Sequence, residues 1–439
     1  MLLSVRPGRA CGSACSSLQI EWLTGVSVSP AARAQCLRRP VRFTPPHSRT
    51  ASRSFHSTNE RSSQSPRISY RVAASSSGKG RPFLPARNAY NFNPDLHEAL
   101  GVAVDIQTPL AKRKRRPDSG EDAFFVSKVG RSDSSSNNSI AFAVADGVGG
   151  WAESRVDPAD FSHALCGYMA ETALAWDQPA DQLRAKSLLQ TGYDMVVADQ
   201  SVPAGGSTAS VGIGLEDGRV ELANLGDSGS VLLRQAAVHH YSIPQTHGFN
   251  TPYQLSIIPP RMRQQASIFG GAYLEDFPRD AITTTLNLHH GDVLILATDG
   301  VFDNLNNQDI LKLVTSRMLY TNAWSASTSP NTGITPASPE TLSALTGPDG
   351  LAALLPKSSE SQPTSKPKKS ATASNPHDAT YTLQSLLAAT IAGEAKLASM
   401  DLRRDGPFAK EAQRYYPGDY YRGGKVDDIT VLVIVAVEQ

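Results

Sequence analysis

The segment ADGVGGW at residues 145–151 is the most informative part of the sequence for the fold and the site. The apolar run 140–144 just before it predicts a buried strand that ends on Asp146, and the glycines after it let a ligand approach the backbone closely. The sequence VLILATDG at residues 293–300 repeats this arrangement, with Asp299 at the strand end. One Asp-Gly after a strand is typical of a hairpin turn. Two of them, together with further acidic pairs beside other apolar runs, favour a single site lined by carboxylate oxygens.

Carboxylate oxygens are the ligands that hard divalent cations prefer. Magnesium and manganese take oxygen ligands in octahedral sites, whereas the chain has no His–Cys spacing of the kind that zinc requires. Two such ions about 3.5–4 Å apart can bridge a hydroxide and stabilise an in-line displacement at phosphorus. The residue types therefore indicate phosphoester hydrolysis.

The charge of the chain is distributed unevenly over its 439 residues, which suffice for one large domain or two ordinary ones. Residues 1–90 hold thirteen Arg and one Lys against Glu21 and Glu60, a net charge of +12. The total of +1 minus this +12 leaves −11 for the remaining 349 residues. A leader rich in Arg and Ser and poor in acids is typical of an organelle transit peptide. The alternative is a basic arm that binds nucleic acid, but lysine and interleaved aromatic residues are nearly lacking.

The segment RSFHST at residues 53–58 resembles the two-step processing signal of mitochondrial precursors. We therefore interpret residues 1–62 as a mitochondrial transit peptide, with the matrix as destination, and the Ser- and Arg-rich residues 63–89 as a flexible linker. No run approaches the roughly 18 apolar residues of a membrane helix, so we predict no transmembrane segment. The cysteine outside the leader, Cys166, has no partner for a disulfide and is expected to be a small apolar residue on a helix.

The pattern between residues 90 and 439 predicts short strands alternating in groups with helices. Asp157 followed by a proline predicts a helix that begins there and runs to about residue 176. The tract 325–380, rich in Ser, Thr, Pro, Ala and Lys, predicts a disordered insertion. The other expected elements are a strand pair at 123–129 and 140–144, helices at 180–199, 307–318 and 381–402, strands at 205–213, 220–225, 230–233, 282–286 and 293–297, and a terminal strand at 429–437.

Six motifs follow one another along the chain: GED at 120–122, DGVGG at 146–150, GSTA at 206–209, NLGDS at 224–228, TDGVFD at 298–303 and DDIT at 427–430. In this order they resemble the metal-dependent type 2C (PPM) protein phosphatases. The ADGVGGW form and the segment HGFNTPYQ at 247–254 are similar to the mitochondrial branch of that family. The resemblance implies an α+β fold for residues 90–439, a four-layer α/β/β/α sandwich with a central antiparallel β-sandwich flanked by helix pairs.

The same resemblance implies a set of metal ligands. Asp146 would bridge two ions and the Gly147 carbonyl would bind one of them, while Asp299 and Asp427 would bind the other and Glu121 would act through water. Asp146 and Asp299 would thus be the catalytic residues.

Other motif residues would support the site without binding metal. Asp122 and Asp428 would stand behind the ligands, and the segments 206–209 and 224–228 would be structural strands and turns near the site.

Two positions depart from the family pattern. Val148 stands where relatives often have a histidine that acts as general acid, and Pro117 stands where they often place a phosphate-binding arginine. We expect Arg116 to bind phosphate instead, with Arg115 as the alternative.

The resemblance implies a protein serine/threonine phosphatase of the mitochondrial matrix that uses Mn²⁺ or Mg²⁺, two ions with a third left open. It would hydrolyse phosphoserine and phosphothreonine on matrix phosphoproteins by a metal-bridged hydroxide, with ubiquinone biosynthesis as a candidate process. We expect a monomer that does not bind nucleic acid.

Two other functions are alternatives to the phosphatase activity. A non-enzymatic pseudophosphatase scaffold is suggested by Val148 and Pro117, but all the carboxylates of the motifs are intact. A serine protease is suggested by GDSGS at 226–230, but no histidine has a matching context and disulfides are absent.

Overall fold

The computed structural model describes residues 67–439, apart from residues 97, 105–107, 131–137, 269–272, 328–332, 353–380 and 419. The transit peptide predicted for residues 1–62 lies outside the described residues. Within the described ranges, no helix is both long and apolar enough to cross a membrane.

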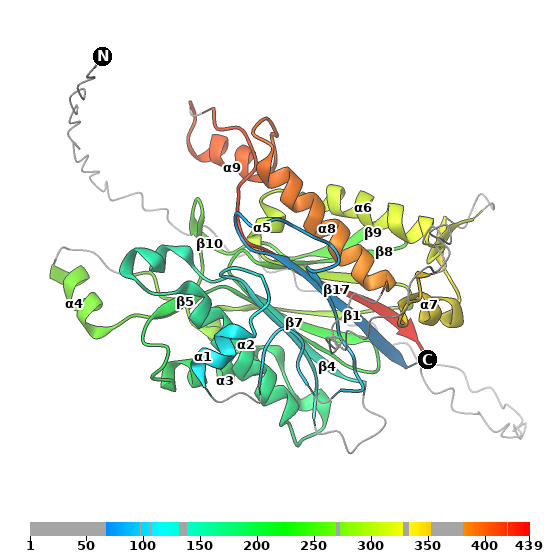
Figure 1. The fold of residues 1–439 in the computed structure, drawn as a ribbon, viewed down its shortest axis with the longest axis horizontal. Coiled ribbons are helices and arrows are strands. Elements are labelled where there is room, and N and C mark those ends of the chain that lie inside the picture. Colours follow the sequence, from blue (N-terminus) through cyan, green and yellow to red (C-terminus); the bar gives the residue numbers. More distant parts are fainter. Residues whose placement is uncertain are drawn as a thin grey trace, which may run out of the picture. The chain divides into compact units, whose positions relative to one another are not determined.

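Two antiparallel sheets form the centre of the described part (Figure 1). The six-stranded sheet has the order β2 (Ala89–Asn91), β1 (Ile68–Ser77), β17 (Ile429–Glu438), β14 (Val293–Ala297), β8 (Gly229–Arg234), β9 (Ala237–Tyr241). The five-stranded sheet has the order β13 (Ile282–Asn287), β7 (Arg219–Leu225), β6 (Ala209–Gly214), β4 (Ile140–Ala145), β3 (Ala123–Lys128). Short strand pairs lie beside them: β5 (Gly205–Ser207) with β12 (Leu255–Ile257), β10 (Thr246–Gly248) with β11 (Thr251–Pro252), and β15 (Trp324–Ala326) with β16 (Ile334–Pro336).

Helices cover the outer faces of both sheets, which gives four layers. Helices α2 (Pro158–Leu174) and α3 (Ala185–Ala198) share one apolar cluster with the five-stranded sheet. Helices α6 (Asn307–Tyr320) and α8 (Leu383–Met400) share another with the six-stranded sheet. A third cluster, built from both sheets, fills the space between them. The predicted α+β four-layer sandwich is confirmed.

The predicted helices form with the expected end signals. The Asp157 carboxylate accepts the Ala159 N–H at 3.2 Å and so caps the N-terminus of α2. Helix α3 begins at residue 185 rather than 180, because a short 3₁₀ helix (Ala180–Gln182) precedes it. Cys166 is buried on α2, as expected. The remaining helices are α1 (Pro109–Lys114), α4 (Pro260–Ile268), α5 (Asp299–Phe302), α7 (Pro339–Thr346) and α9 (Pro407–Tyr415).

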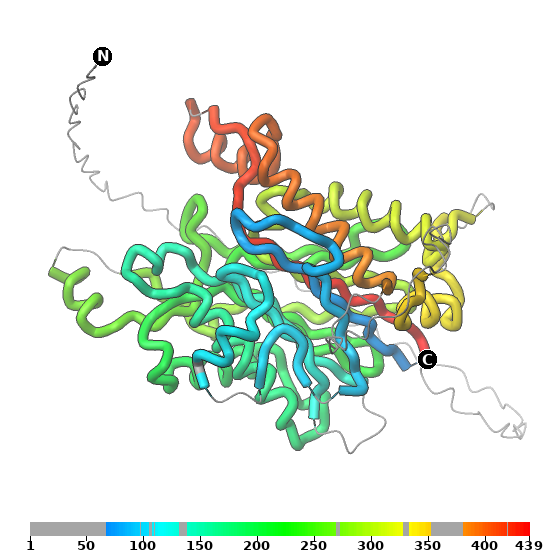
Figure 2. Tube along the Cα trace, viewed as in Figure 1, coloured from blue at the N-terminus to red at the C-terminus, as the bar shows by residue number. Residues whose placement is uncertain are grey.

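The prediction of a flexible linker at residues 63–89 is wrong for Ile68–Ser77, which forms the core strand β1. This strand pairs along its whole length with β17, and Figure 2 traces the two side by side. The ladder pairs the backbone groups of its buried serines, and the Ser75 hydroxyl donates to the Asn88 carbonyl at 2.7 Å. The high serine content of this segment is therefore the reason why the sequence pattern did not predict a strand here.

The predicted disordered insertion at 325–380 is wrong for its first part. Strands β15 and β16 and helix α7 lie at residues 324–326, 334–336 and 339–346. Trp324 and Leu342 are fully buried in the cluster of the six-stranded sheet, and the Trp324 indole N–H donates to the Gly291 carbonyl at 3.0 Å. Residues 353–380 lie outside the described part of the chain.

Candidate active site

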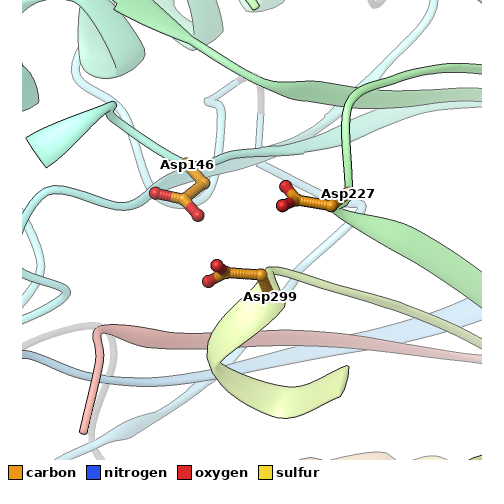
Figure 3. A group of neighbouring side chains, drawn as sticks. All are labelled: Asp146, Asp227 and Asp299. Carbon is orange, nitrogen blue, oxygen red and sulfur yellow. The ribbon is translucent and has the colours of Figure 1, made fainter. Parts of the chain in front are cut away.

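Three carboxylates meet where strands of both sheets end (Figure 3). Asp146 follows β4, Asp227 lies in the connection from β7 to β8, and Asp299 begins α5 directly after β14. Each side chain offers an oxygen, and these oxygens all lie within 4.8 Å of one another. We call these residues the Asp triad. It unites the two Asp-Gly strand ends that the sequence singled out and adds Asp227.

The backbone at the end of β4 is fixed by the neighbouring strands. The Asp146 carbonyl accepts the Thr208 N–H at 3.0 Å and the Ser207 hydroxyl at 2.8 Å, and the Gly147 N–H donates to the Glu121 carbonyl at 3.2 Å. A Cβ at Gly147 would lie only 2.6 Å from the Glu121 carbonyl oxygen, so the close approach requires glycine here. Asp146 is therefore held on a rigid support.

The Asp triad concentrates negative charge. Burial, followed by the charges of Asp299, Asp122 and other neighbouring carboxylates, raises the pKa of Asp146 well above its usual value. Burial followed by Asp299 raises the pKa of Asp227 in the same way. Oxygen ligands that repel one another in a partly buried site are relieved by a divalent cation. The donor set therefore fits Mn²⁺ or Mg²⁺.

One side of the Asp triad already faces a cation from the chain. The Lys425 ammonium lies 2.5 Å from Asp299, 2.7 Å from Asp303 and 3.1 Å from Asp427. Burial opposes its charge, but these three carboxylates outweigh burial and raise the pKa of Lys425. Burial and Asp299 also raise the pKa of Asp303, to about 7. Asp427 thus lies beside Lys425 rather than within the Asp triad.

Asp122 and Asp428 bind protein groups. The Asp428 carboxylate accepts the Glu121 N–H at 2.7 Å and also the Lys79 N–H. The buried Asp122 carboxylate accepts the Thr298 hydroxyl at 2.8 Å, next to Asp299. Both therefore support segments that carry acidic residues of the site.

Glu121 also lies outside the Asp triad. Its carboxylate faces Gly149, since an oxygen lies 2.9 Å from where a Cβ of that glycine would be. Burial, followed by Asp428 and Asp427, raises the pKa of Glu121. It thus shares the acidic environment without joining the three oxygens that converge.

Arg116 does not face the Asp triad. Its guanidinium lies 2.7 Å from Asp160 and 3.5 Å from Asp157, at the start of α2. It lines a separate hollow together with Arg115 and the buried His163. Asp227 and Asp299 line a different hollow. We therefore do not propose Arg116 as the residue that binds the substrate phosphate.

Val148 has an apolar environment. It packs against a small cluster formed by Trp151, Ala204 and Ile258, and its N–H donates to the Gly206 carbonyl at 3.0 Å. A valine offers no proton, so this position supplies none to a leaving group.

Sequence reasoning missed Asp227 and Lys425 as site residues. Asp227 follows an apolar strand, as Asp146 and Asp299 do, but serine rather than glycine comes after it, and segment 224–228 was expected to be a structural turn. Lys425 carries no local signal, because its partners Asp299 and Asp303 lie more than 120 residues away along the chain.

Several known proteins are similar to this chain in sequence. A family model described as protein phosphatase 2C matches residues 113–329. The mitochondrial protein phosphatase 2C homolog 7 of Saccharomyces cerevisiae is 38% identical over 261 residues, 59% of this chain and 72% of that protein. The 5-azacytidine resistance protein azr1 of Schizosaccharomyces pombe is 30% identical over 320 residues, 73% of this chain and 82% of that protein.

Solved structures are also similar. The photosystem II phosphatase PBCP matches with a TM-score of 0.46 and 24% identity, over 75% of this chain and 95% of that one. The catalytic domain of the serine/threonine phosphatase PstP, in complex with two manganese ions, matches with a TM-score of 0.38 and 14% identity, over 84% of this chain and 99% of that one.

The chain belongs to the protein phosphatase 2C family and is a metal-dependent protein serine/threonine phosphatase.

Proposed function

We propose that this phosphatase acts in the mitochondrial matrix, on phosphoserine and phosphothreonine of matrix proteins, with two Mn²⁺ or Mg²⁺ ions at the Asp triad. The convergence of Asp146, Asp227 and Asp299 is the observation that carries the metal assignment. The Arg-rich, acid-poor leader supports the compartment, and the yeast relative is named as mitochondrial. We further propose that the protein is a monomer and that its substrates include proteins of ubiquinone biosynthesis, which the sequence resemblance supports.

We assign the metal ligands as follows. Asp146, the Gly147 carbonyl, Asp227, Asp299 and Asp427 would hold the ions, with Glu121 acting through water. When bound, such ions polarise the phosphoryl group and lower the pKa of water so that it attacks phosphorus. The protein contributes a rigid set of oxygens, since the strand ends and the buried carboxylates behind them fix each ligand.

Lys79 is the basic residue that we assign to the substrate phosphate. Its ammonium lies 3.5 Å from Asp427, and its side chain is 61% exposed, whereas that of Lys425 is 16% exposed and faces three carboxylates. The Lys79 turn is fixed by Asp428, which accepts its N–H, and by Lys396, whose ammonium donates to the Gly78 carbonyl at 2.9 Å. An exposed ammonium on a fixed turn beside the ligands suits a phosphate dianion.

The direct test is hydrolysis of an aryl phosphate and a phosphothreonine peptide by the full chain, with Mn²⁺ and in excess chelator. We expect turnover of both that requires the metal. Lys79→Gln should weaken inhibition by inorganic phosphate, with Lys79→Arg as the matched control that retains it. Metal binding without any turnover would instead favour the scaffold function, which Val148 motivates.

The substrates and the compartment need separate measurements. Comparing the phosphoproteomes of mitochondria with and without the protein should reveal matrix sites whose phosphorylation rises when it is absent. An unchanged matrix phosphoproteome would contradict the proposed location. Light scattering of the purified chain tests the monomer.

A further inference from the structure

A hollow of about 610 Å³ adjoins the Asp triad, and the proposed metal and phosphate sites leave most of it unused. Asp227, Asp299 and Asp303 line one end of it. None of its lining residues is Lys, Arg or His. Most of those other than the three aspartates are apolar or aromatic: Tyr241, Ile243, Pro244, Phe249, Phe302, Leu305, Pro407, Phe408 and Tyr415. We call this hollow the aromatic groove.

One wall of the aromatic groove is the hairpin of β10 and β11, which carries Phe249 at its turn. The base of this hairpin is bound to the loop that presents Asp227, because the Gln245 N–H donates to the Gly226 carbonyl at 2.9 Å. His247 steadies the hairpin by stacking on Tyr253 at a ring-centroid distance of 4.2 Å. The hairpin is thus positioned relative to the Asp triad.

The opposite wall is the start of α9. The Phe408 N–H donates to the Asp303 carbonyl at 3.0 Å, and the Lys425 ammonium lies 5.4 Å from the centre of the Phe408 ring. The Phe249 ring reaches this wall, with ring centroids 5.2 Å from Phe408 and 5.6 Å from Tyr415. Figure 1 shows α9 and the β10 hairpin on the same side of the molecule as α5. Both walls are therefore tied to residues beside the catalytic carboxylates.

We propose that the aromatic groove binds the substrate segment next to the phosphorylated residue and selects bulky apolar side chains there. This inference rests on the proposed phosphatase site, with which the groove is continuous. Ile243 and Tyr415 are 71% and 47% exposed, and a bound apolar side chain removes such surface from water. The Glu411 carboxylate lines the same space, so an acidic side chain beside the phosphoresidue is repelled. The substrate class is thus phosphoserine or phosphothreonine with apolar, non-acidic neighbours.

The test uses two phosphothreonine peptides that differ only in having Phe or Asp two residues before and after the phosphothreonine. A single methylene in an apolar pocket changes kcat/KM about 10- to 200-fold, so we expect the Phe peptide, which differs by more than this, to be favoured at least about tenfold. Ile243→Asp should lower kcat/KM for the Phe peptide about tenfold more than for aryl phosphate, which is too small to fill the groove. Tyr415→Ala should act in the same direction. Tyr320→Ala, which alters a 69% exposed aromatic residue at the end of α6, is the matched control.

Equal kcat/KM for the two peptides in the unaltered chain would overturn the proposal. Equal losses on the Phe peptide and aryl phosphate in Ile243→Asp would also overturn it. If the unaltered chain fails to hydrolyse aryl phosphate with Mn²⁺, the proposed function fails instead. Fluorescence anisotropy of the labelled peptides then tests the groove alone: tighter binding of the Phe peptide supports it, and equal binding refutes it.

Discussion

The chain contains the tripeptide Asp-Gly-Val twice, at the end of a strand in each sheet, and the two copies have different surroundings. Asp146 follows β4, and its pKa is raised by burial and by carboxylates alone. Asp299 follows β14 and lies 2.5 Å from the Lys425 ammonium. One half of the site therefore carries its own cation, and we propose that the other half takes a cation from solution. The same local sequence thus gives two electrostatic situations, because residues from distant parts of the chain decide them.

The largest effect is expected from Asp146→Asn. This change removes the charge that no lysine balances, so it should lower kcat on aryl phosphate by at least about 10²–10³-fold, the loss typical of a removed electrostatic stabiliser. The metal-free melting temperature should stay the same or rise, because repulsion with the neighbouring carboxylates is relieved. Asp299→Asn is the matched variant, and it should lower the metal-free melting temperature, since Lys425 loses a partner. Equal thermal shifts in the two variants would remove the distinction between the halves.

Lys425→Met tests the half with its own cation. Removing one partner of a buried ion pair costs about 3–5 kcal/mol, and since Lys425 is 16% exposed we expect about 2–3 kcal/mol less unfolding free energy in chelator. Saturating Mn²⁺ should restore much of this loss, because a divalent ion can neutralise the same carboxylates. Urea denaturation with and without Mn²⁺ measures both values. A loss of the same size in both conditions would mean that Lys425 only packs.

The two halves differ in how far the sequence predicts them. The strand ends at Asp146 and Asp299 follow from apolar runs, and the layered fold follows from the alternation of strands and helices. Asp227 and Lys425 enter through pairings between distant segments, which no local pattern encodes. Strand β1 was missed for a related reason, because the backbone groups of its buried serines are paired only once β17 lies beside it.

A smaller effect is expected from pH on the metal-free protein. The pKa of Asp303 rises from an ordinary value of 3.8 to about 7 in the folded state, so the folded chain keeps a proton that the unfolded chain has lost. The free energy of unfolding should therefore fall as pH rises from about 4 to about 7 and then level off. The raised pKa values of Asp146 and Asp227 act in the same direction. Thermal melts in chelator across this range check the sign, and a rise in stability toward pH 7 would contradict it.

The smallest effect is expected at the valines. Val301 is fully buried behind Asp299, whereas Val148 is partly exposed beside Asp146. Val148→His should raise turnover of a phosphoserine peptide more than that of aryl phosphate, since an alkoxide leaving group needs a proton and an aryl oxide needs little. The gain should fall well below the 10²–10⁴-fold of a positioned acid, because nothing orients the new imidazole. Equal changes on both substrates would show that position 148 does not govern protonation of the leaving group.

We infer that the half of the site around Asp146 requires a divalent cation from solution. Calorimetric titration of Mn²⁺ into the unaltered chain and into Asp146→Asn at one pH tests it most directly. We expect saturable Mn²⁺ binding by the unaltered chain, and at least about tenfold weaker Mn²⁺ binding or fewer bound ions in the variant. Unchanged affinity and stoichiometry in Asp146→Asn would contradict it.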